Sequence, residues 1–376
     1  MSDSHEDPVK DRHMNGRTIE PLQLEGNENV ADMIDNVFAG SGFNARRLAE
    51  AAHLFSRMLD APTTVALTLA GAMTPIGMSG PIVRLIENGF VDFVISTGAN
   101  LYHDLHRPFD MPMVQGHESV DDNELADTGI ARIFDVFIED DDTLMASDRV
   151  ILNAVRELQA DCPISTASLH YALGQRIARK APQPQKSILA VATEHDVPVF
   201  TSSPGDSSIG MNLVPGHLFG KPVRLDPILD VIESTAIVRA ADKNGVIEVG
   251  GGSPKNFYLQ TQPTLHQILL DRSKGGHDYV IQLTVDAPYW GGLSGATPSE
   301  ARSWGKIKDA NRNNVVVYSC ASLTLPLLAQ YVLVRNKPRQ PKRLMKHLPD
   351  MVEQLKAFAA SNQELRDQLK AYYPVR

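Results

Sequence analysis

The feature that most constrains this chain is a repeated alternation of short apolar runs with amphipathic helices. Six runs rich in β-branched and apolar residues have the length of strands, and most of them lead into a turn rich in glycine or serine. Strands that alternate with helices in this way form open, largely parallel sheets covered on both faces. We therefore predict an α/β fold with strands at residues 63–69, 91–96, 197–201, 246–249, 279–284 and 314–318.

Helical periodicity between these strands predicts the layers that cover the sheet. The expected helices are 44–59, 81–88, 187–195, 224–241 and 268–274, one that starts at Ser322, and a long amphipathic tail over 342–373. Residues 1–28 have few apolar anchors, so we expect a flexible N-terminal segment there. The remainder, 29–376, is predicted to form a single domain.

Composition excludes several functional classes. The chain has 376 residues, 43% of them hydrophobic, and no apolar run approaches the 18 residues that suggest a membrane span. The polar N-terminus lacks the apolar core of a secretory signal, and the two cysteines, Cys162 and Cys320, cannot form a disulfide framework. A net charge of −9 argues against a general nucleic-acid binder but is compatible with attracting a polycation. We expect a cytoplasmic enzyme.

The segments that follow the predicted strands indicate a nucleotide-sized site, because ligands of parallel sheets bind beyond the carboxyl ends of the strands. These segments include AGAMTPIG, STGAN, TSSPGDSSIG and GGGSPKN. The dinucleotide fingerprint GxGxxG and the phosphate loop GxxxxGK[ST] are both absent. Gly250, Gly251 and Gly252 still fit close approach of the backbone to a ligand, although a plain tight turn explains them equally well.

The segment WGGLSGATPSEARSWGKI contains the strongest candidate for chemistry. Residues 297–300 form a capping-box pattern for a short helix, and Gly305 is a natural left-handed stop. A reversal at Gly305 would bring Lys306, Trp304 and Glu300 into one pocket. A lysine desolvated beside an indole acquires the lowered pKa that an amine nucleophile needs. The alternative is that Lys306 is one solvated lysine among 36 basic residues and Glu300 only caps a helix.

Other polar groups have plainer explanations. His103 and His106 lie three residues apart and His117 follows, but no HExxH motif or clear third ligand accompanies them, so no metal site is expected. Asp206 comes just after a strand, where it could bind a ribose hydroxyl or a cationic substrate, or could cap a turn.

The segment SGATPSEARSWGKI, followed by VVVYSCASLTLPLLAQYVL, closely resembles the C-terminal signature of deoxyhypusine synthase. The resemblance extends from about Leu67 to Val334 and includes VDFVISTGANLYHDL, VPVFTSSPGDSSIG and VIEVGGGSPKN in the family's order. It implies a Rossmann-like domain that assembles as a homotetramer and binds NAD near the dimer interfaces. It also implies the family's reaction, in which the aminobutyl group of spermidine is carried as an imine on a lysine and passed to an acceptor amine.

The resemblance also implies roles for particular residues. By residue match, Lys306 is the imine-forming lysine, Trp304 the wall beside the polyamine and Glu300 a substrate-binding carboxylate. The further candidates for substrate contacts are Asn256, Trp290 and His103, together with Tyr289. The residues expected to hold NAD are Thr97, Gly98, Ala99, Asp206, Gly251, Gly252, Asp286 and Ser319.

Several positions depart from the family's pattern. The replacements are Asn256 for a histidine, Met211, Leu293 and Cys320 for aspartates, and Tyr102 and His103 for a glutamate pair. Losing a charged partner of a buried cation costs about 2–5 kcal/mol. The chain therefore resembles the divergent, deoxyhypusine synthase-like proteins of bacteria, and we expect a free diamine such as putrescine as acceptor, giving homospermidine.

Two alternatives remain open at this point. One is an authentic deoxyhypusine synthase that modifies a lysine of a translation factor, against which the lost aspartates count. The other is a non-catalytic NAD-binding homologue that acts through its oligomeric surface, which gives no reason to retain the SWGK sequence beside Glu300.

Overall fold

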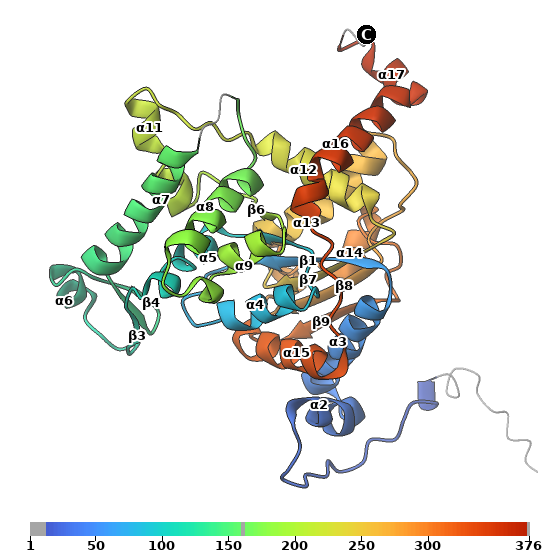
Figure 1. Ribbon diagram of the computed structural model, residues 1–376. Helices are drawn as coiled ribbons and strands as arrows, with labels where there is room; N and C mark the ends of the chain where they lie inside the picture. The colour runs from blue at the N-terminus through green and yellow to red at the C-terminus, as the bar shows by residue number, and fades with distance from the viewer. Residues whose placement is uncertain (1–12, 159–161, 374–376) are drawn as a thin grey trace, which may run out of the picture.

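The centre of the protein is a six-stranded sheet in which every neighbouring pair is parallel (Figure 1). The computed structural model describes residues 13–158 and 162–373. The six strands are β1 (Thr63–Leu69), β2 (Phe93–Ser96), β6 (Val199–Thr201), β7 (Lys243–Val249), β8 (Tyr279–Thr284) and β9 (Asn314–Tyr318). All six predicted strands are confirmed, with ends that shift by up to three residues.

The order of the strands fixes where a ligand can bind. Across the sheet the order is β6-β2-β1-β7-β8-β9, so the chain builds outward from β1 in one direction and then outward from β7 in the other. Dinucleotide-binding sheets have the same order, and their crevice lies where the direction reverses. This confirms the predicted Rossmann-like α/β fold and places the reversal between β1 and β7.

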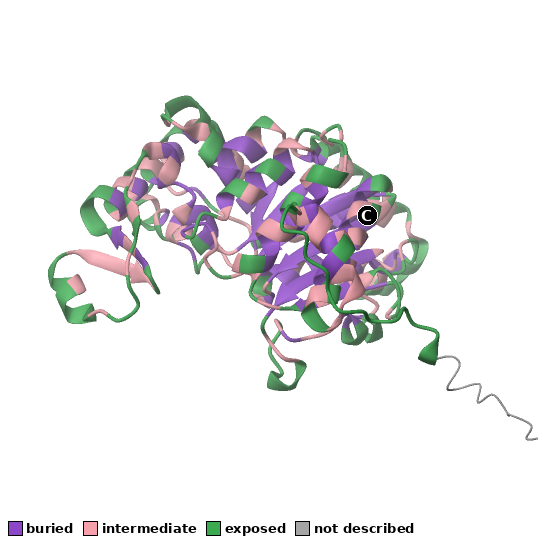
Figure 2. Cartoon of the chain, turned by 90° about the horizontal axis from the view of Figure 1, so that it is seen from below, coloured by how far each residue is buried: buried purple, intermediate pink, exposed green. Residues whose placement is uncertain are grey.

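Alternation along each strand produces two apolar faces. Leu67, Ile247 and Ile281 belong to one core, and their chain neighbours on the same strands, including Ala66 and Val246, belong to the other. Figure 2 shows the strands buried between the helical layers. The first face is covered by α3 (Phe43–Asp60), α4 (Ser79–Glu87) and α15 (Ala321–Arg335), and the second by α12 (Pro227–Ala240), α13 (Gly252–Pro263) and α16 (Leu344–Ser361).

Most of the long insertion between β2 and β6 was not predicted from the sequence; the helix expected at 187–195 lies in it and is confirmed as α9 (Ile188–Glu194). The insertion contains a three-stranded antiparallel sheet of order β3-β5-β4 and occupies the left side of Figure 1. Its main elements are α5 (Gly98–His103), β3 (Met113–Gln115), α6 (Asp122–Asp127), β4 (Ile130–Ile133), β5 (Val136–Glu139), α7 (Ala146–Glu157), α8 (Thr166–Lys180) and α9 (Ile188–Glu194). Between β6 and α12 lie two short helices, α10 (Ser208–Met211) and α11 (Val214–Leu218).

Two helix predictions are wrong. No helix spans 268–274: the helical turns that extend α13 end at Ile268, and Leu270 takes a left-handed φ of 54°. The tail over 342–373 is two helices, because Asn362 ends α16 and caps α17 (Gln363–Leu369) by accepting a hydrogen bond from the amide of Leu365. Its amide group also donates to the carbonyl of Leu269.

The predicted N-terminal segment falls partly outside the described residues, which begin at His13. Residues 15–29 contain neither helix nor strand and are mostly exposed. The elements that follow these residues are α2 (Val30–Asp32), a π-helical turn at Met33–Val37 and a 3₁₀ turn at Phe38–Gly40. Along the described part of the chain, no helix combines the length and apolarity needed to cross a membrane.

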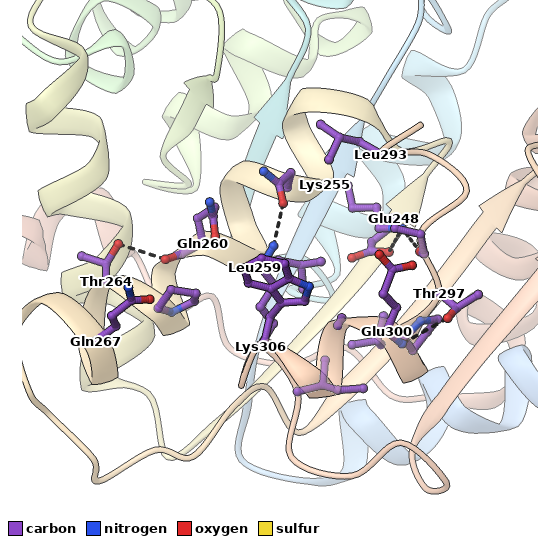
Figure 3. A pocket seen from close by; sticks show the side chains of 18 of the residues that line it. Glu248, Lys255, Leu259, Gln260, Thr264, Gln267, Leu293, Thr297, Glu300 and Lys306 are labelled. Atoms are coloured by element: carbon purple, nitrogen blue, oxygen red, sulfur yellow. Dashed lines mark hydrogen bonds and ion pairs between the residues drawn. The ribbon is translucent and has the colours of Figure 1, made fainter. Parts of the chain in front are cut away.

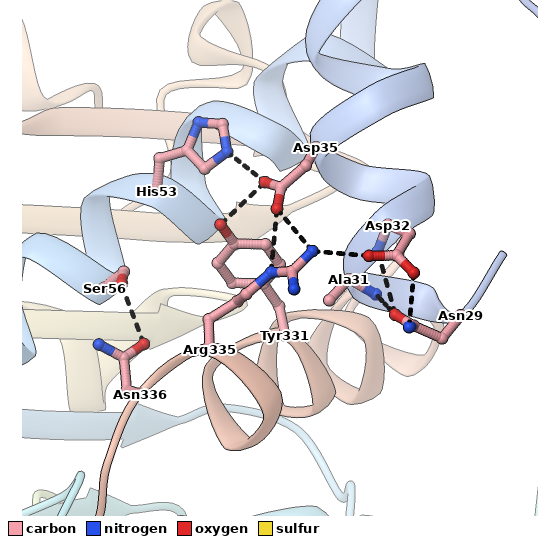
Figure 4. Close-up of polar contacts among 9 residues, drawn as sticks. All are labelled: Asn29, Ala31, Asp32, Asp35, His53, Ser56, Tyr331, Arg335 and Asn336. Carbon is pink, nitrogen blue, oxygen red and sulfur yellow. Dashed lines mark hydrogen bonds and ion pairs between the residues drawn. The ribbon is translucent and has the colours of Figure 1, made fainter.

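A polar network attaches these N-terminal turns to the body of the protein (Figure 4). Asp35 accepts hydrogen bonds from His53 on α3 at 2.7 Å and from Tyr331 and Arg335 on α15 at 2.9 and 3.0 Å. Arg335 also contacts Asp32 at 2.8 Å. Three segments that are far apart in the sequence therefore meet at one carboxylate.

Candidate active site

The best-formed cavity lies between α13 and the segment 293–307, beside β7 and β8 (Figure 3). Its volume is about 470 Å³, within the range of small-molecule sites. The charged, polar and aromatic residues of its lining include Glu248, Lys255, Asn256, Glu300, Trp304 and Lys306. Its apolar lining includes Leu259, Pro263, Ile268, Val280 and Leu293.

A short capped helix places Lys306 in this cavity. The Thr297 hydroxyl accepts a hydrogen bond from the amide of Glu300 at 3.1 Å and begins α14 (Pro298–Ser303). Gly305 then takes a left-handed φ of 68°, and the Lys306 amide donates back to the carbonyl of Ala301 at 3.0 Å. This is the helix ending that glycine favours. The predicted cap and reversal are both confirmed.

The amine of Lys306 is partly buried and has a neutral partner. Its Nζ donates to Oδ1 of Asn256 at 2.9 Å and lies 5.9 Å from the centre of the Trp304 ring. Burial and the nearby charge of Lys255 lower the pKa of Lys306, while the charges of Glu300 and Glu248 oppose that shift. A lowered pKa increases the neutral fraction of the amine, which is the nucleophilic form.

A second lysine and a second carboxylate of this cavity were missed in the sequence. Lys255 is buried, and its Nζ donates to the Ala296 carbonyl at 2.6 Å and to Oε1 of Gln282 at 3.1 Å. Glu248, on β7, lies 3.9 Å from the same Nζ. Burial raises the pKa of Glu248 to about 7, against the opposing charges of Lys255 and Lys306. A glutamate inside the apolar strand sequence VIEV was the signal that could have revealed this pair.

The structure brings together most, but not all, of the residues predicted to contact a substrate. Trp304, Glu300 and Asn256 line the cavity with Lys306, as does Leu293, a position at which the sequence resemblance implies an aspartate. Trp290 does not line it: the indole is 74% exposed and packs against Tyr289 in a 3₁₀ turn. These two aromatic residues stand on the loop that follows β8.

His103 also lies outside the cavity lining. It is at the end of α5, and its Nδ1 is 2.8 Å from Nε2 of His106, whose other ring nitrogen contacts the Ser147 hydroxyl at 2.8 Å. Burial lowers the pKa of His103 to about 4, so the ring is neutral near pH 7. Among the described residues, no group of three His, Cys, Asp or Glu side chains is placed to hold a metal ion.

The residues predicted to hold NAD lie at the carboxyl ends of the strands. Thr97 caps α5 directly after β2, and Gly98 packs so closely on Ser207 that an added Cβ would lie 2.3 Å from the Ser207 side chain. Asp206, beside Ser207, is exposed in the loop after β6. The predicted residues Thr97, Gly98, Ala99 and Asp206 therefore belong to one part of the sheet edge.

The remaining predicted NAD residues follow β7, β8 and β9. An added Cβ at Gly251 would lie 2.4 Å from Cα of Ser294, so the glycine turn is packed against the loop that borders the cavity. The next residue but one, Ser253, donates to the Ser202 hydroxyl at 2.8 Å and connects this turn to the end of β6. Gly252 begins α13, Asp286 follows β8 and Ser319 follows β9.

Comparison with known proteins gives a consistent result. A profile of the family "Deoxyhypusine synthase" matches residues 32–332. The chain is 44% identical to a deoxyhypusine synthase-like protein of Cyanothece sp., over 90% of this chain and 87% of that protein. It is 38% identical to "Probable deoxyhypusine synthase 2" of Methanosarcina acetivorans, over 86% of this chain and 91% of that protein.

A solved structure supports the fold. The crystal structure of an Entamoeba histolytica protein assigned as a deoxyhypusine synthase superimposes with a TM-score of 0.58, at 15% identity, over 86% of this chain and 99% of that one. The family profile covers most of the chain, including the cavity, α14 and Lys306. The chain belongs to the deoxyhypusine synthase family.

Proposed function

We propose that the protein is an NAD-dependent transferase that carries an aminobutyl-type group from spermidine or a related polyamine on Lys306 and delivers it to an acceptor amine. The observation that carries this proposal is the partly buried amine of Lys306, held by Asn256 in a cavity with an aromatic wall and two carboxylates. Burial and Lys255 lower the pKa of this amine, as imine chemistry requires.

The residues of this chain have distinct tasks in such a reaction. Neutral Lys306 attacks the imine carbon of the oxidised substrate, forms its own imine with that carbon and releases the original amine. An acceptor amine then attacks the same carbon, forms a new imine and releases Lys306. Asn256 accepts a hydrogen bond from the Lys306 amine and so directs it. The Trp304 ring provides a flat apolar surface for the alkyl chain, and Glu300 provides an anion for an ammonium group.

The sheet edge fits NAD. The N-terminus of α13 lies beside the reversal in strand order, its N-cap Gly251 makes no side-chain cap, and Gly250 and Gly252 both have positive φ. No side chain of the described residues caps this 12-residue helix, and the amides of its first two residues, Gly252 and Ser253, suit a phosphate group. The residues that would hold the dinucleotide are those at the strand ends, Thr97, Gly98, Ala99, Asp206, Gly251, Gly252, Asp286 and Ser319. When bound, NAD would supply the oxidation of the donor amine and the final reduction.

The charge pattern of the cavity favours a small free amine as acceptor. Leu293 is apolar where the family's pattern has an aspartate, so a substrate meets a different set of anions here. A free diamine such as putrescine would give homospermidine. An authentic deoxyhypusine synthase remains the second candidate, because relatives that are 37–38% identical carry that name.

A trapping experiment tests this function. The protein is incubated with NAD and spermidine, treated with borohydride, digested and analysed by mass spectrometry, with Lys306→Arg and Lys308→Arg as a matched pair. Lys308 is more exposed and pairs with Asp278, so its replacement serves as the control. We expect an aminobutyl adduct on Lys306 in the wild type and in Lys308→Arg, and none in Lys306→Arg.

The acceptor is identified in the same reaction. Adding putrescine should consume the adduct and produce homospermidine. Deoxyhypusine on an added translation factor, without homospermidine, would favour the second candidate. Tight NAD binding with no adduct from any amine would contradict transfer altogether and leave a non-catalytic homologue.

A further inference from the structure

Glu248 is a buried carboxylate to which no described residue donates a hydrogen bond. Its side chain is fully buried, and both carboxylate oxygens lack a hydrogen-bond partner. The nearest cation, Nζ of Lys255, is 3.9 Å away, beyond hydrogen-bonding distance. Buried carboxylates are ordinarily hydrogen-bonded, because taking a charge out of water is costly. The two free oxygens therefore require an explanation.

The neighbours of Glu248 are already committed to other partners. Gln282, opposite Glu248 on β8, donates to the carbonyls of Gly250 at 3.0 Å and Ser294 at 2.7 Å and accepts from Lys255. Lys255 donates its shortest hydrogen bond, at 2.6 Å, to the Ala296 carbonyl; its third N–H has no hydrogen bond to Glu248, with which it forms only an ion pair at 3.9 Å. The Glu248 carboxylate is therefore an acceptor left without a hydrogen bond, and it lines the cavity that contains Lys306 (Figure 3).

The charges around the cavity also do not balance once Lys306 is neutral. Two carboxylates, Glu248 and Glu300, and two lysines, Lys255 and Lys306, line it. When both carboxylates are ionised and Lys306 is neutral, or bound as an uncharged imine, the lining carries one net negative charge. One cationic group of a ligand would neutralise that charge.

We infer that Glu248 is the subsite carboxylate that pairs with the terminal primary ammonium of a linear aliphatic diamine or polyamine bound in this cavity. The inference rests on the proposed function, because it assigns one end of that function's substrate. An ammonium donates up to three hydrogen bonds and would satisfy oxygens that the protein leaves free. Because Glu248 stands on the central strand β7, its position is fixed by the sheet.

This assignment gives the site a pH dependence. The charged groups that act on Glu248 are Lys255 and Lys306. Glu300 acts on these two lysines, and Glu248 itself helps to raise the pKa of Tyr258 on α13. Burial raises the pKa of Glu248 to about 7, so the carboxylate becomes protonated below that pH. Diamine affinity should therefore weaken as the pH falls through about 7, and a glutamine at position 248 should remove this part of the dependence.

Calorimetric titration with putrescine, with NAD omitted so that no oxidation occurs, tests the inference. The proteins are the wild type, Glu248→Gln, Glu248→Asp and Glu233→Gln. Glu233 is a matched control because it is a partly buried glutamate outside this cavity, and one of its oxygens has no hydrogen-bond partner among the described residues. We expect affinity to fall at least about tenfold in Glu248→Gln, the loss of a charged hydrogen bond, less in Glu248→Asp, and not at all in Glu233→Gln.

Borohydride trapping of butanal on Lys306 provides the second measurement. Butanal has no ammonium group, so Glu248→Gln should be labelled at least as fast as the wild type, which shows that its cavity and Lys306 are intact. Any of three results would overturn the inference: Glu248→Gln binds putrescine as tightly as the wild type, Glu233→Gln loses as much affinity as Glu248→Gln, or the wild type does not bind putrescine. An aminobutyl adduct from spermidine and NAD would still support the proposed function in those cases, so the two can fail separately.

Discussion

At the scale of single residues, the neutrality of Asn256 is central to the proposed chemistry. Its amide oxygen lies 2.9 Å from the Lys306 amine and orients it without stabilising the charged form as a carboxylate would. Asn256→Asp places an anion at that distance and should raise the pKa of Lys306. We expect the acid limb of the pH–rate profile to move to higher pH, with a rate about tenfold lower near pH 7 that recovers in alkali.

The matched control is Asn256→Ala, which removes the acceptor without adding a charge. Its rate should fall at every pH while the acid limb stays in place or moves to lower pH. An unmoved limb in Asn256→Asp would show that the ionisation of Lys306 does not control the reaction.

The sequence was enough to place some residues in the cavity but not others. Lys306, Trp304 and Glu300 lie within one capped turn, so local spacing and the resemblance were enough to group them. Glu248 and Lys255 reach the same cavity from β7 and α13. Only the packing of α13 over the sheet makes them neighbours of Lys306. Trp290 lies on an exposed loop, whose packing the sequence does not determine.

At the scale of elements, the turn after α14 depends on a glycine. Gly305 has positive φ, and an added Cβ would lie 2.7 Å from Nε2 of His266. Gly305→Ala should destabilise the fold by more than the roughly 1–2 kcal/mol of left-handed φ alone, and should reduce Lys306 trapping severalfold or more. Gly291→Ala is the comparison, since Gly291 has φ +74° in open space.

Urea unfolding and the rate of borohydride trapping measure both variants. The difference between them isolates the contact with His266, because the backbone cost is shared. Equal losses of stability and trapping in the two variants would mean that the His266 contact does not hold Lys306 in place.

The Asp35 network provides a prediction for stability. Burial acts to raise the pKa of Asp35, but hydrogen bonds from His53, Tyr331 and Arg335 outweigh it and lower the pKa. A lowered pKa means stabilisation that is present above the unfolded pKa near 3.8 and lost as the pH falls through the folded value. Asp35→Asn should lower the free energy of unfolding by about 1–3 kcal/mol at pH 7 and by less near pH 3.

Urea titrations at several pH values measure this effect. Asp367→Asn, on an exposed residue of α17, is the control and should change little. A loss at Asp35 that is the same at pH 3 and pH 7 would show that the charge of the carboxylate is not what stabilises the N-terminal turns.

The elements that the sequence predicted well carry their signal along their own length, as continuous apolar runs in the buried strands and as a helical period in α3. The six strands and α3 are of this kind. The break between α16 and α17 depends on Asn362, whose hydrogen bond to Leu269 comes from a distant segment. The small sheet β3-β5-β4 has strands of only three or four residues, and only β5 alternates between buried and more exposed positions.

At the scale of the whole molecule, one segment exposes several large apolar side chains, two of which line the cavity. Val285, Tyr289, Trp290, Leu293 and Trp304 are between 49% and 80% exposed and lie on the segment that follows β8. A patch of this kind indicates a protein interface, in agreement with the homotetramer that the resemblance implies. Trp290→Lys should therefore shift the protein to smaller assemblies and lower its activity.

Sedimentation velocity measures the assembly, with Phe219→Lys as the control. Phe219 is 85% exposed near α11, in a different part of the chain. An unchanged mass distribution in Trp290→Lys would place the subunit interface elsewhere.

The strand order has a consequence for how the protein is made. The central pair joins β1 to β7, and Thr63 lies opposite Lys243, about 180 residues further along the chain. Closing so long a loop is slow, and structures dominated by such distant pairings fold slowly. During synthesis on the ribosome, the edge of β1 that pairs with β7 has no partner strand until β7 emerges. During that interval the nascent chain exposes the strand edge that later borders the crevice where the strand order reverses, and we expect this stage of synthesis to depend most on chaperones.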